Sequence, residues 1–448
     1  MTAVDELRAA LPVGAVLSDA DVVDAYRRDE ARLVSPGEAL AVVLAQSTDD
    51  VRTTLRWAAQ HRIPVVARGA GTGLSGGAAA SEGCVVLSLA KMAAILELNP
   101  DDQLAVVQPG VVNADLQKAA AEHQLMYAPD PASFEISTIG GNIATNAGGL
   151  RCVKYGVTRE AVLGLEVVLA DGRVLNTGRR TVKGVAGYDL TSLFVGSEGT
   201  LGVITSATVR LTPKPAADPV TIVGVFATLP AAGAAVNDVM RAGLRPSLLE
   251  LMDKATIRAV DDWKHVGLDR DAAAMLVAQV DSDHPREPAQ RIEKAFVDAG
   301  ATYTAVSSDA VEAAELIGVR RMTHWALERL GPILTEDVGV PRSKLAQMLQ
   351  RIEEIAYEYG VAVLTVGHAG DGNLHPSLVV DNDRAWPAAE AIYQAALDLG
   401  GTITGEHGIG VLKRDWLPSE IGATSLAVQR SIKEALDPLG ILNPGKAI

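Results

Sequence analysis

Two histidines could hold a metal ion if the chain between them turns back on itself. His368 follows an apolar, β-type run at 361–366, and His375 lies in a second run at 374–380. The turn sequence Gly370-Asp371-Gly372 separates the runs. In a hairpin centred on that turn the histidines would face each other, with Cβ atoms about 4.5–5.5 Å apart, and both rings could reach one metal ion. The alternative is a pair of structural histidines.

A glutamate and a histidine are adjacent later in the chain, in Gly405-Glu406-His407-Gly408. Adjacent side chains project differently, so one could ligate a metal ion while the other faces a substrate and moves a proton. Arg320 and Arg321 offer guanidinium groups whose paired N–H donors match a carboxylate. Solvation at the surface is the alternative for both arginines.

A glycine-rich loop lies in the first third of the chain and contains a GxGxxG pattern at 71–76. Its residues are Arg68, Gly69, Ala70, Gly71, Thr72, Gly73, Leu74, Ser75, Gly76 and Gly77. A dinucleotide-binding Rossmann unit needs a helix directly after this pattern. Only residues 78–83 separate the loop from the next strand, so no crossover helix fits there. A strand–loop–strand turn remains, whose backbone N–H groups can surround a diphosphate. A flexible surface loop is the alternative.

Two further glycine segments favour a ligand-binding role over a flexible surface loop. The second follows Pro129, Asp130 and Pro131, and it would let a flat ligand approach closely. Its candidate ligand-binding residues are Thr138, Gly140, Gly141, Thr145, Asn146, Gly148 and Gly149. The third, 196–204, follows 183–189 and contains Glu198, Gly199, Gly202 and Ile204.

The elements that would carry these segments can be predicted coarsely. The pattern predicts a helix at 49–62, strands at 63–67 and 84–89, and a hairpin of 165–170 with 173–175. Two short β-type runs, at 95–98 and 104–107, flank a turn. We therefore predict a first domain over 1–215.

The pattern changes after Pro215, where strands and helices alternate with few glycines. This predicts an α+β domain over 216–405, with 406–448 returning to the site of the first domain. The uncharged stretch 219–237 is interrupted by glycine and proline, so it predicts strand, turn and helix rather than a membrane span.

Composition limits the class of protein. The 448 residues carry a net charge of −15, and only 4% are aromatic, which disfavours nucleic acid as a partner and limits any membrane contact to a peripheral one. Cys84 and Cys152 cannot form an iron–sulfur cluster or a disulfide framework. The first residues lack a signal-peptide pattern, so we predict a cytoplasmic protein.

The three glycine segments resemble the FAD-binding domain of vanillyl-alcohol-oxidase-like flavoproteins. From about residue 38 to Pro444 the chain is most similar to the D-2-hydroxy-acid dehydrogenases, which include D-lactate dehydrogenase, the flavin subunit of glycolate oxidase and D-2-hydroxyglutarate dehydrogenase. The resemblance implies that 68–77 contacts the pyrophosphate of FAD and 138–149 lies along the flavin. Some relatives attach FAD through a histidine in the first loop, and none lies between Arg68 and Gly77, so non-covalent FAD is implied.

The resemblance also assigns roles to the polar residues. It implies that His368, His375 and Glu406 bind a divalent metal, with zinc favoured over manganese or iron, and that His407 is the base beside the flavin. Of the two arginines, Arg320 is the better placed. A lysine of the D-2-hydroxyglutarate enzymes falls near Thr335, which argues against a second carboxylate on the substrate. Asn443 resembles a contact to the flavin ring, with a chain-end turn as the alternative.

The resulting hypothesis is an α+β, two-domain flavoenzyme that oxidises a small D-2-hydroxy acid of the lactate or glycolate type to the 2-oxo acid. Electrons would leave to an external acceptor: a quinone, an electron-transfer flavoprotein or an iron–sulfur subunit. A homodimer is an open option. Two alternatives remain on the same fold: an alkyl-glycerone-phosphate-synthase-like transferase, and a flavin-binding module without catalysis.

Overall fold

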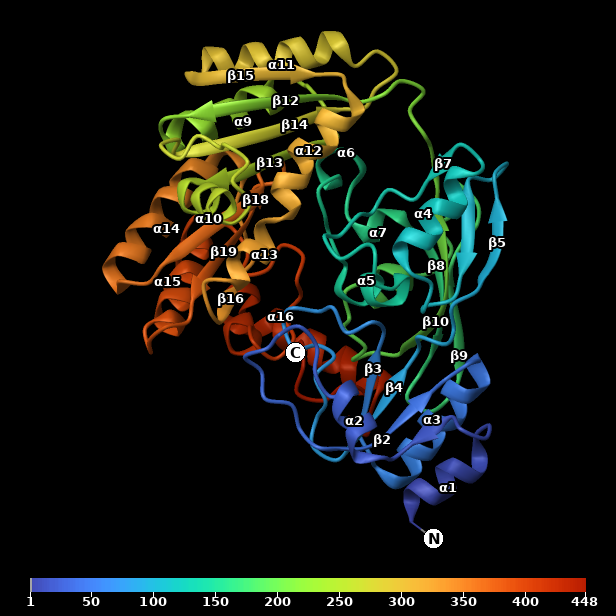
Figure 1. Ribbon diagram of the computed structural model, residues 1–448. Coiled ribbons are helices and arrows are strands. Elements are labelled where there is room, and N and C mark those ends of the chain that lie inside the picture. The colour runs from blue at the N-terminus through green and yellow to red at the C-terminus, as the bar shows by residue number, and fades with distance from the viewer. Residues whose placement is uncertain (1) are drawn as a thin grey trace. The chain divides into compact units, whose positions relative to one another are not determined.

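The computed structural model describes residues 2–448, apart from the side chains at positions 310, 321 and 324. The chain divides into two compact units, coloured along the sequence in Figure 1. The first contains the residues up to Gly148, Gly156–Lys214 and Glu406–Ile448, and the second contains Gly149–Tyr155 and Pro215–Gly405. The excursion of 149–155 into the second unit was not part of the boundaries expected from the sequence.

The first unit is built on two main sheets and the helices that cover them. Its elements are α1 (Ala3–Ala10), β1 (Val16–Leu17), α2 (Ala20–Tyr26), β2 (Ala39–Leu44), α3 (Thr48–His61), β3 (Val65–Arg68), β4 (Cys84–Ser88), β5 (Ile95–Asn99), β6 (Leu104–Val107), α4 (Asn113–Ala121), β7 (Leu125–Met126), α5 (Ile139–Thr145), α7 (Thr158–Ala161), β8 (Val162–Val168), β9 (Val174–Gly178), α8 (Leu190–Phe194), β10 (Val203–Arg210), β11 (Thr212–Pro213) and α16 (Leu417–Leu436).

The smaller main sheet of the first unit has the order β1-β2-β4-β3. Strands β3 and β4 are parallel neighbours, so residues 69–83 between them form a crossover that contains no helix. The sequence correctly excluded a helix here. Residue 442 pairs in parallel with Val65, so the C-terminal segment lies along the free side of β3.

The larger sheet of the first unit is antiparallel, in the order β5-β6-β10-β8-β9. The predicted hairpin is confirmed as β8 and β9, with Gly172 at φ +80° in its turn. The second glycine segment contains a helix, Ile139–Thr145, that the sequence did not predict. Thr138 caps this helix, and Asn146 ends it in the left-handed conformation.

The second unit is one antiparallel sheet with helices on both faces. Its elements are α6 (Cys152–Tyr155), β12 (Val220–Phe226), α9 (Leu229–Arg241), β13 (Leu248–Asp253), α10 (Lys254–Lys264), β14 (Ala274–Val280), α11 (Arg286–Asp298), β15 (Ala301–Ser307), α12 (Ala310–Arg321), α13 (Thr323–Glu328), β16 (Ile333–Thr335), β17 (Val338–Gly339), α14 (Leu345–Tyr359), β18 (Val363–His368), β19 (Asn373–Val379) and α15 (Ala385–Asp398).

The sheet of the second unit runs β15-β12-β14-β13-β18-β19-β16, with β17 also on β19. Phe226 of β12 stacks edge-on against Phe296 of α11, and Figure 1 shows α9 and α11 together on this face. The opposite face buries Val225, Met252 and Val366 against the helices α10, α12 and α13. The candidate site lies on this opposite face, because side chains alternate along each strand.

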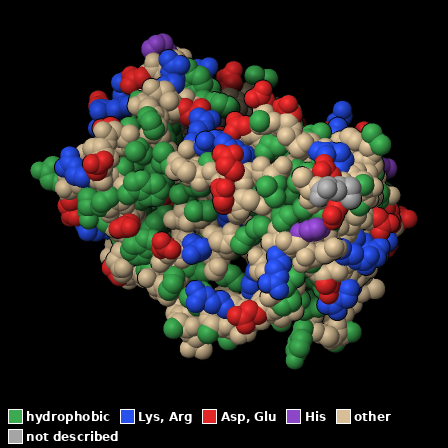
Figure 2. Space-filling view, turned by 90° about the horizontal axis from the view of Figure 1, so that it is seen from below, with side chains coloured by type: hydrophobic (Ala, Val, Ile, Leu, Met, Phe, Trp, Pro, Cys, Tyr) green, Lys and Arg blue, Asp and Glu red, His purple; other side chains and the backbone are tan. Residues whose placement is uncertain are grey.

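Two observations bear on the nucleic-acid and membrane partners that the sequence disfavoured. On the face drawn in Figure 2, basic and acidic side chains are interspersed, which gives no basic stripe for a phosphate backbone there. Within residues 2–448, no helix has the length and apolar character needed to cross a bilayer. The stretch 219–237 forms β12 and the start of α9, as predicted.

Candidate active site

The two predicted metal-binding histidines lie on the hairpin β18–β19, and its register differs from the one expected. His368 is opposite Asn373, and His375 is opposite Val366. The predicted facing pair was therefore wrong by two residues, because the turn between the strands is shorter than assumed. A shift of two residues keeps both side chains on one face. The histidines are diagonal neighbours with ring centroids 5.1 Å apart.

A buried glutamate joins His368 to Arg320. Glu250, on β13, is the residue opposite His368 on β18. Its Oε1 lies 2.8 Å from Nδ1 of His368, and its Oε2 accepts a hydrogen bond from Nε of Arg320 at 2.9 Å. The side chain of Glu250 is 2% exposed and that of Arg320 is 11% exposed. Arg320 also donates from Nη1 to Thr323.

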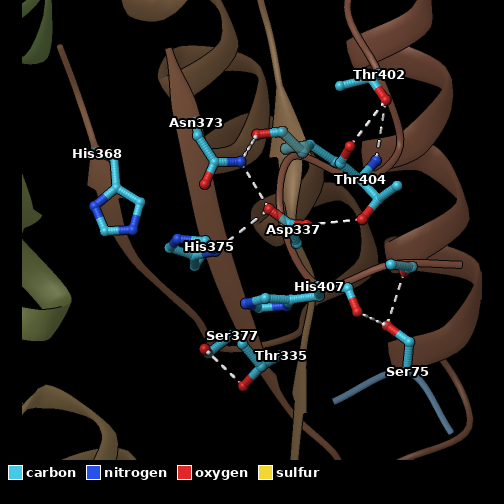
Figure 3. A network of polar contacts seen from close by, with 12 residues as sticks. Ser75, Thr335, Asp337, His368, Asn373, His375, Ser377, Thr402, Thr404 and His407 are labelled. Atoms are coloured by element: carbon cyan, nitrogen blue, oxygen red, sulfur yellow. Dashed lines mark hydrogen bonds and ion pairs between the residues drawn. The ribbon is translucent and has the colours of Figure 1, made fainter. Parts of the chain in front are cut away.

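A second buried carboxylate lies beside His375, as Figure 3 shows. Asp337 Oδ1 is 3.6 Å from Nδ1 of His375 and accepts a hydrogen bond from Asn373 at 2.7 Å. Its Oδ2 accepts a hydrogen bond from the hydroxyl of Thr404. His368 therefore has a carboxylate hydrogen-bonded at Nδ1, an arrangement that orients Nε2 for metal binding, and His375 has a carboxylate close to its Nδ1.

The donor set in the second unit fits a divalent metal of the zinc class. His368 and His375 are 7% and 6% exposed, and imidazole nitrogen is a preferred zinc ligand. Glu406, the third predicted ligand, is the first residue of the segment assigned to the first unit. It directly follows Gly405, which lies against the amide of Asn373. Arg321, the other predicted cation, has a side chain outside the described residues.

The first unit brings its first and second glycine segments together. A Cβ on Gly69 would lie 2.3 Å from the hydroxyl of Thr138, and one on Gly71 would lie 2.1 Å from the guanidinium of Arg68. Gly71 also has φ +78°, which favours glycine. Arg68 donates to the carbonyl of Arg28, and burial lowers the pKa of its guanidinium. The bare backbone over 69–77 fits a diphosphate.

The C-terminal segment packs against these glycine segments within the first unit. Ser75 donates to the carbonyls of His407 and Gly408, as drawn in Figure 3. A Cβ on Gly148 would lie 2.2 Å from the carboxylate of Glu406. His407 and Glu406, both predicted functional residues, are therefore held by the predicted flavin-binding segments.

The third glycine segment is also tied to the C-terminal segment. The carboxylate of Glu198 accepts hydrogen bonds from the backbone of Ile409 and Gly410, both at 2.8 Å. Burial raises the pKa of Glu198, and these two N–H donors oppose that rise. Glu198 thus joins the third glycine segment to the C-terminal segment. Its contact with FAD stays a prediction.

Asn443 is buried and uses its amide on protein backbone. It donates to the carbonyls of Gly77 and Glu198, at 2.9 and 2.7 Å, and accepts from Lys446. Lys446 also donates to the carbonyl of Ala79, and burial lowers the pKa of its ammonium group to about 8. Both residues brace the end of the first glycine loop. The predicted flavin contact of Asn443 is not tested.

The sequence reasoning did not single out the buried carboxylates of Glu250, Asp337 and Asp29. Glu250 interrupts an apolar β-type run, and Asp337 lies in such a run beside Glu336. Ionised side chains at such positions are almost never buried without partners. That interruption was the available signal. Asp29, whose carboxylate accepts hydrogen bonds from Ala31 and Ala78, had no comparable signal because it lies in a polar segment.

Comparison with known proteins agrees with this architecture. Residues 39–178 match a family model described as an FAD binding domain, and residues 215–447 match one described as FAD linked oxidases, C-terminal domain. The chain belongs to the FAD-linked oxidase family. It is an FAD-linked oxidoreductase with an FAD-binding domain, as the sequence predicted.

Individual members of the FAD-linked oxidase family are similar over most of their length. The chain is 43% identical to "Glycolate oxidase subunit GlcD" of Bacillus subtilis, over 91% of this chain and 88% of the relative. It is 40% identical to "D-lactate dehydrogenase" of Archaeoglobus fulgidus, over 95% and 96%. A solved alkyldihydroxyacetonephosphate synthase has a TM-score of 0.76 at 18% identity, over 99% of this chain and 84% of that one. That likeness shows the fold alone, and the predicted two-domain fold is confirmed.

Proposed function

We propose that this FAD-linked oxidase oxidises a small D-2-hydroxy acid of the lactate or glycolate type to the 2-oxo acid. The observation that carries the proposal is the group of His368, His375 and Arg320 on one face of the second unit. Two imidazoles, one hydrogen-bonded at Nδ1 to a carboxylate and the other with a carboxylate 3.6 Å from Nδ1, suit a metal site. A guanidinium beside them suits a carboxylate. The names of the relatives support the same substrate class.

In this proposal the chain's own residues bind and deprotonate the substrate. Arg320 binds the substrate carboxylate. Its Nε and Nη1 donate to Glu250 and Thr323, and its Nη2, which makes no hydrogen bond within the described residues, donates to the substrate. His407 accepts the hydroxyl proton on its imidazole ring. His368, His375 and Glu406 would hold the divalent metal, zinc being favoured over manganese or iron, and the metal would lower the pKa of the hydroxyl. The flavin would supply the hydride acceptor.

The substrate's side chain is proposed to be short and uncharged. Thr335, at the position of a lysine in the D-2-hydroxyglutarate enzymes, makes a hydrogen bond of 3.2 Å with Ser377 of the neighbouring strand. Neither residue can pair with a second carboxylate as an ammonium group does. Substrates with a distal carboxylate should therefore be poor.

Electrons are proposed to leave to an external acceptor, because Cys84 and Cys152 are too few for an iron–sulfur cluster. A quinone, an electron-transfer flavoprotein and an iron–sulfur subunit are all suitable. Anaerobic titration with D- and L-2-hydroxy acids tests the reaction, since only a dehydrogenase ends with bleached, reduced flavin. A transferase or a flavin-binding module would leave the flavin oxidised with every acid in the panel.

FAD should be released from the purified protein by acid precipitation. The first glycine loop carries no histidine for covalent attachment, and its backbone can hold the diphosphate by hydrogen bonds alone. Flavin absorbance is measured in the supernatant and in the washed pellet. Colour that stays with the pellet would contradict non-covalent binding. A colourless protein that free FAD cannot reconstitute would contradict the proposed function.

Replacing Arg320 by lysine should raise KM for the hydroxy acid about 10- to 100-fold, from a loss of about 1.5–3 kcal/mol for charge-assisted hydrogen bonds. An ammonium group cannot bond Glu250 and present two parallel donors to a carboxylate. Steady-state kinetics measures the effect, with Arg321→Lys made alongside. If Arg321→Lys is impaired and Arg320→Lys behaves as wild type, the carboxylate-binding residue is Arg321.

A further inference from the structure

We infer that Glu250 is a positioning residue that holds the metal ligand His368 and the carboxylate-binding Arg320 in one fixed arrangement. The inference rests on the proposed function and adds to it a group that touches neither substrate nor cofactor. One carboxylate would thereby fix the orientation of both the ring that binds the metal and the guanidinium that binds the substrate.

The geometry divides the two oxygens of Glu250 between two partners. Oε1 lies 2.8 Å from Nδ1 of His368, and Oε2 lies 2.9 Å from Nε of Arg320. A carboxylate only accepts hydrogen bonds, so the ring nitrogen that faces it carries the proton. The lone pair of His368 is then on Nε2, which is the tautomer needed to bind a cation.

The backbone gives this arrangement little freedom. Glu250 and His368 are direct neighbours across β13 and β18, and Arg320 comes from α12, which covers the same face. Glu250 is flanked on its strand by Leu249 and Leu251, which are 1% and 0% exposed. Burying a carboxylate without partners costs free energy, and the donors on His368 and Arg320 stabilise this one.

Asp337 provides a natural contrast. Its Oδ1 is 3.6 Å from Nδ1 of His375, beyond hydrogen-bond distance, and it accepts hydrogen bonds from Asn373 and Thr404. Asp337 therefore lies beside one ligand and is held by two neutral side chains, whereas Glu250 joins a ligand to a cation. Asp337→Asn should change metal affinity with little effect on KM.

The test compares Glu250→Gln and Glu250→Asp with Glu354→Gln, a matched change at an exposed ion pair on α14. Zinc affinity is measured by titrating Zn²⁺ into metal-stripped protein, and kcat and KM are measured on the reloaded enzyme. Glutamine keeps one acceptor oxygen and presents an NH₂ group to the other donor. We expect Glu250→Gln to lose about 10- to 100-fold in zinc affinity and to raise KM as well.

Glu250→Asp keeps the charge but shortens the side chain, so one carboxylate can no longer reach both partners. It should fold and retain FAD, and it should show the same two defects to a smaller extent. The effects of Glu250→Gln and Arg320→Lys on KM should be less than multiplicative when combined, because both remove the same contact. Glu354→Gln should leave every parameter unchanged.

The outcomes separate this inference from the proposed function. Normal zinc affinity or normal KM in both Glu250 variants would overturn the inference alone, as would a fully multiplicative double variant. Failure of Glu250→Gln to fold would leave Glu250→Asp to decide in the same way. Wild-type protein that binds zinc but oxidises no 2-hydroxy acid would overturn the proposed function, while the zinc titration still tests Glu250. Wild-type protein with no affinity for zinc, manganese or iron would overturn both.

Discussion

Replacing His407 by asparagine should slow flavin reduction by about 10²- to 10⁴-fold, the usual contribution of a general base. Asparagine is similar in size and polarity but cannot accept the hydroxyl proton. The backbone of His407 is fixed by Ser75, whose hydroxyl donates to its carbonyl, so the change should leave the local fold intact. Stopped-flow reduction under anaerobic conditions measures the rate.

The control for His407 is its neighbour. His407→Asn should keep both FAD and metal, whereas Glu406→Ala should keep FAD and lose metal. Elemental analysis of the two variants separates the roles. Metal loss from the His407 variant, or full metal content in the Glu406 variant, would show that the roles of these neighbours are exchanged.

Removing either buried histidine of the β18–β19 hairpin should abolish activity. His368→Ala and His375→Ala each take one ligand from a three-ligand site, so metal and activity should be lost together while FAD stays bound. Metal content, flavin absorbance and flavin reduction are measured on each variant. His284→Ala, an exposed position between β14 and α11, is the control and should match wild type.

Activity that survives loss of metal would contradict this prediction, because the histidines would then be structural. Loss of FAD together with metal would indicate instead that the substitution disrupts the fold. Either substitution removes the imidazole beside a buried carboxylate, Glu250 or Asp337, which could destabilise the fold. Flavin absorbance therefore has to be measured on each variant.

The sequence predicted the elements whose signals are local. The hairpin β8–β9 carries Asp171-Gly172 in its turn between β-type runs, and α3 begins at a Ser47 cap with acidic residues in its first turn. The absence of a helix in 69–83 followed from chain length alone. Each of these features is decided by residues close together in the sequence.

Features that depend on distant partners were predicted less well. The register of β18–β19 was wrong because Gly370-Asp371-Gly372 marks a turn without fixing how many residues it contains. Helix α5 was missed because glycines lower helix propensity, while Thr138 and packing of Gly140 against Pro109 support the helix in the fold. The role of Glu250 depends on the pairing of β13 with β18, which no local pattern indicates.

The contacts between the C-terminal segment and the end of the first glycine loop imply an order of assembly for the first unit. Residue 442 extends the sheet beside Val65, and Asn443 and Lys446 bond the carbonyls of Gly77 and Ala79. The end of the loop at 69–77 is thus synthesised early, whereas Asn443 and Lys446, which brace it, are synthesised more than 360 positions later. During translation the entire second unit must emerge first, so the end of the first glycine loop lacks these C-terminal contacts throughout that interval. FAD should therefore be captured after translation, by a protein whose two units have already formed.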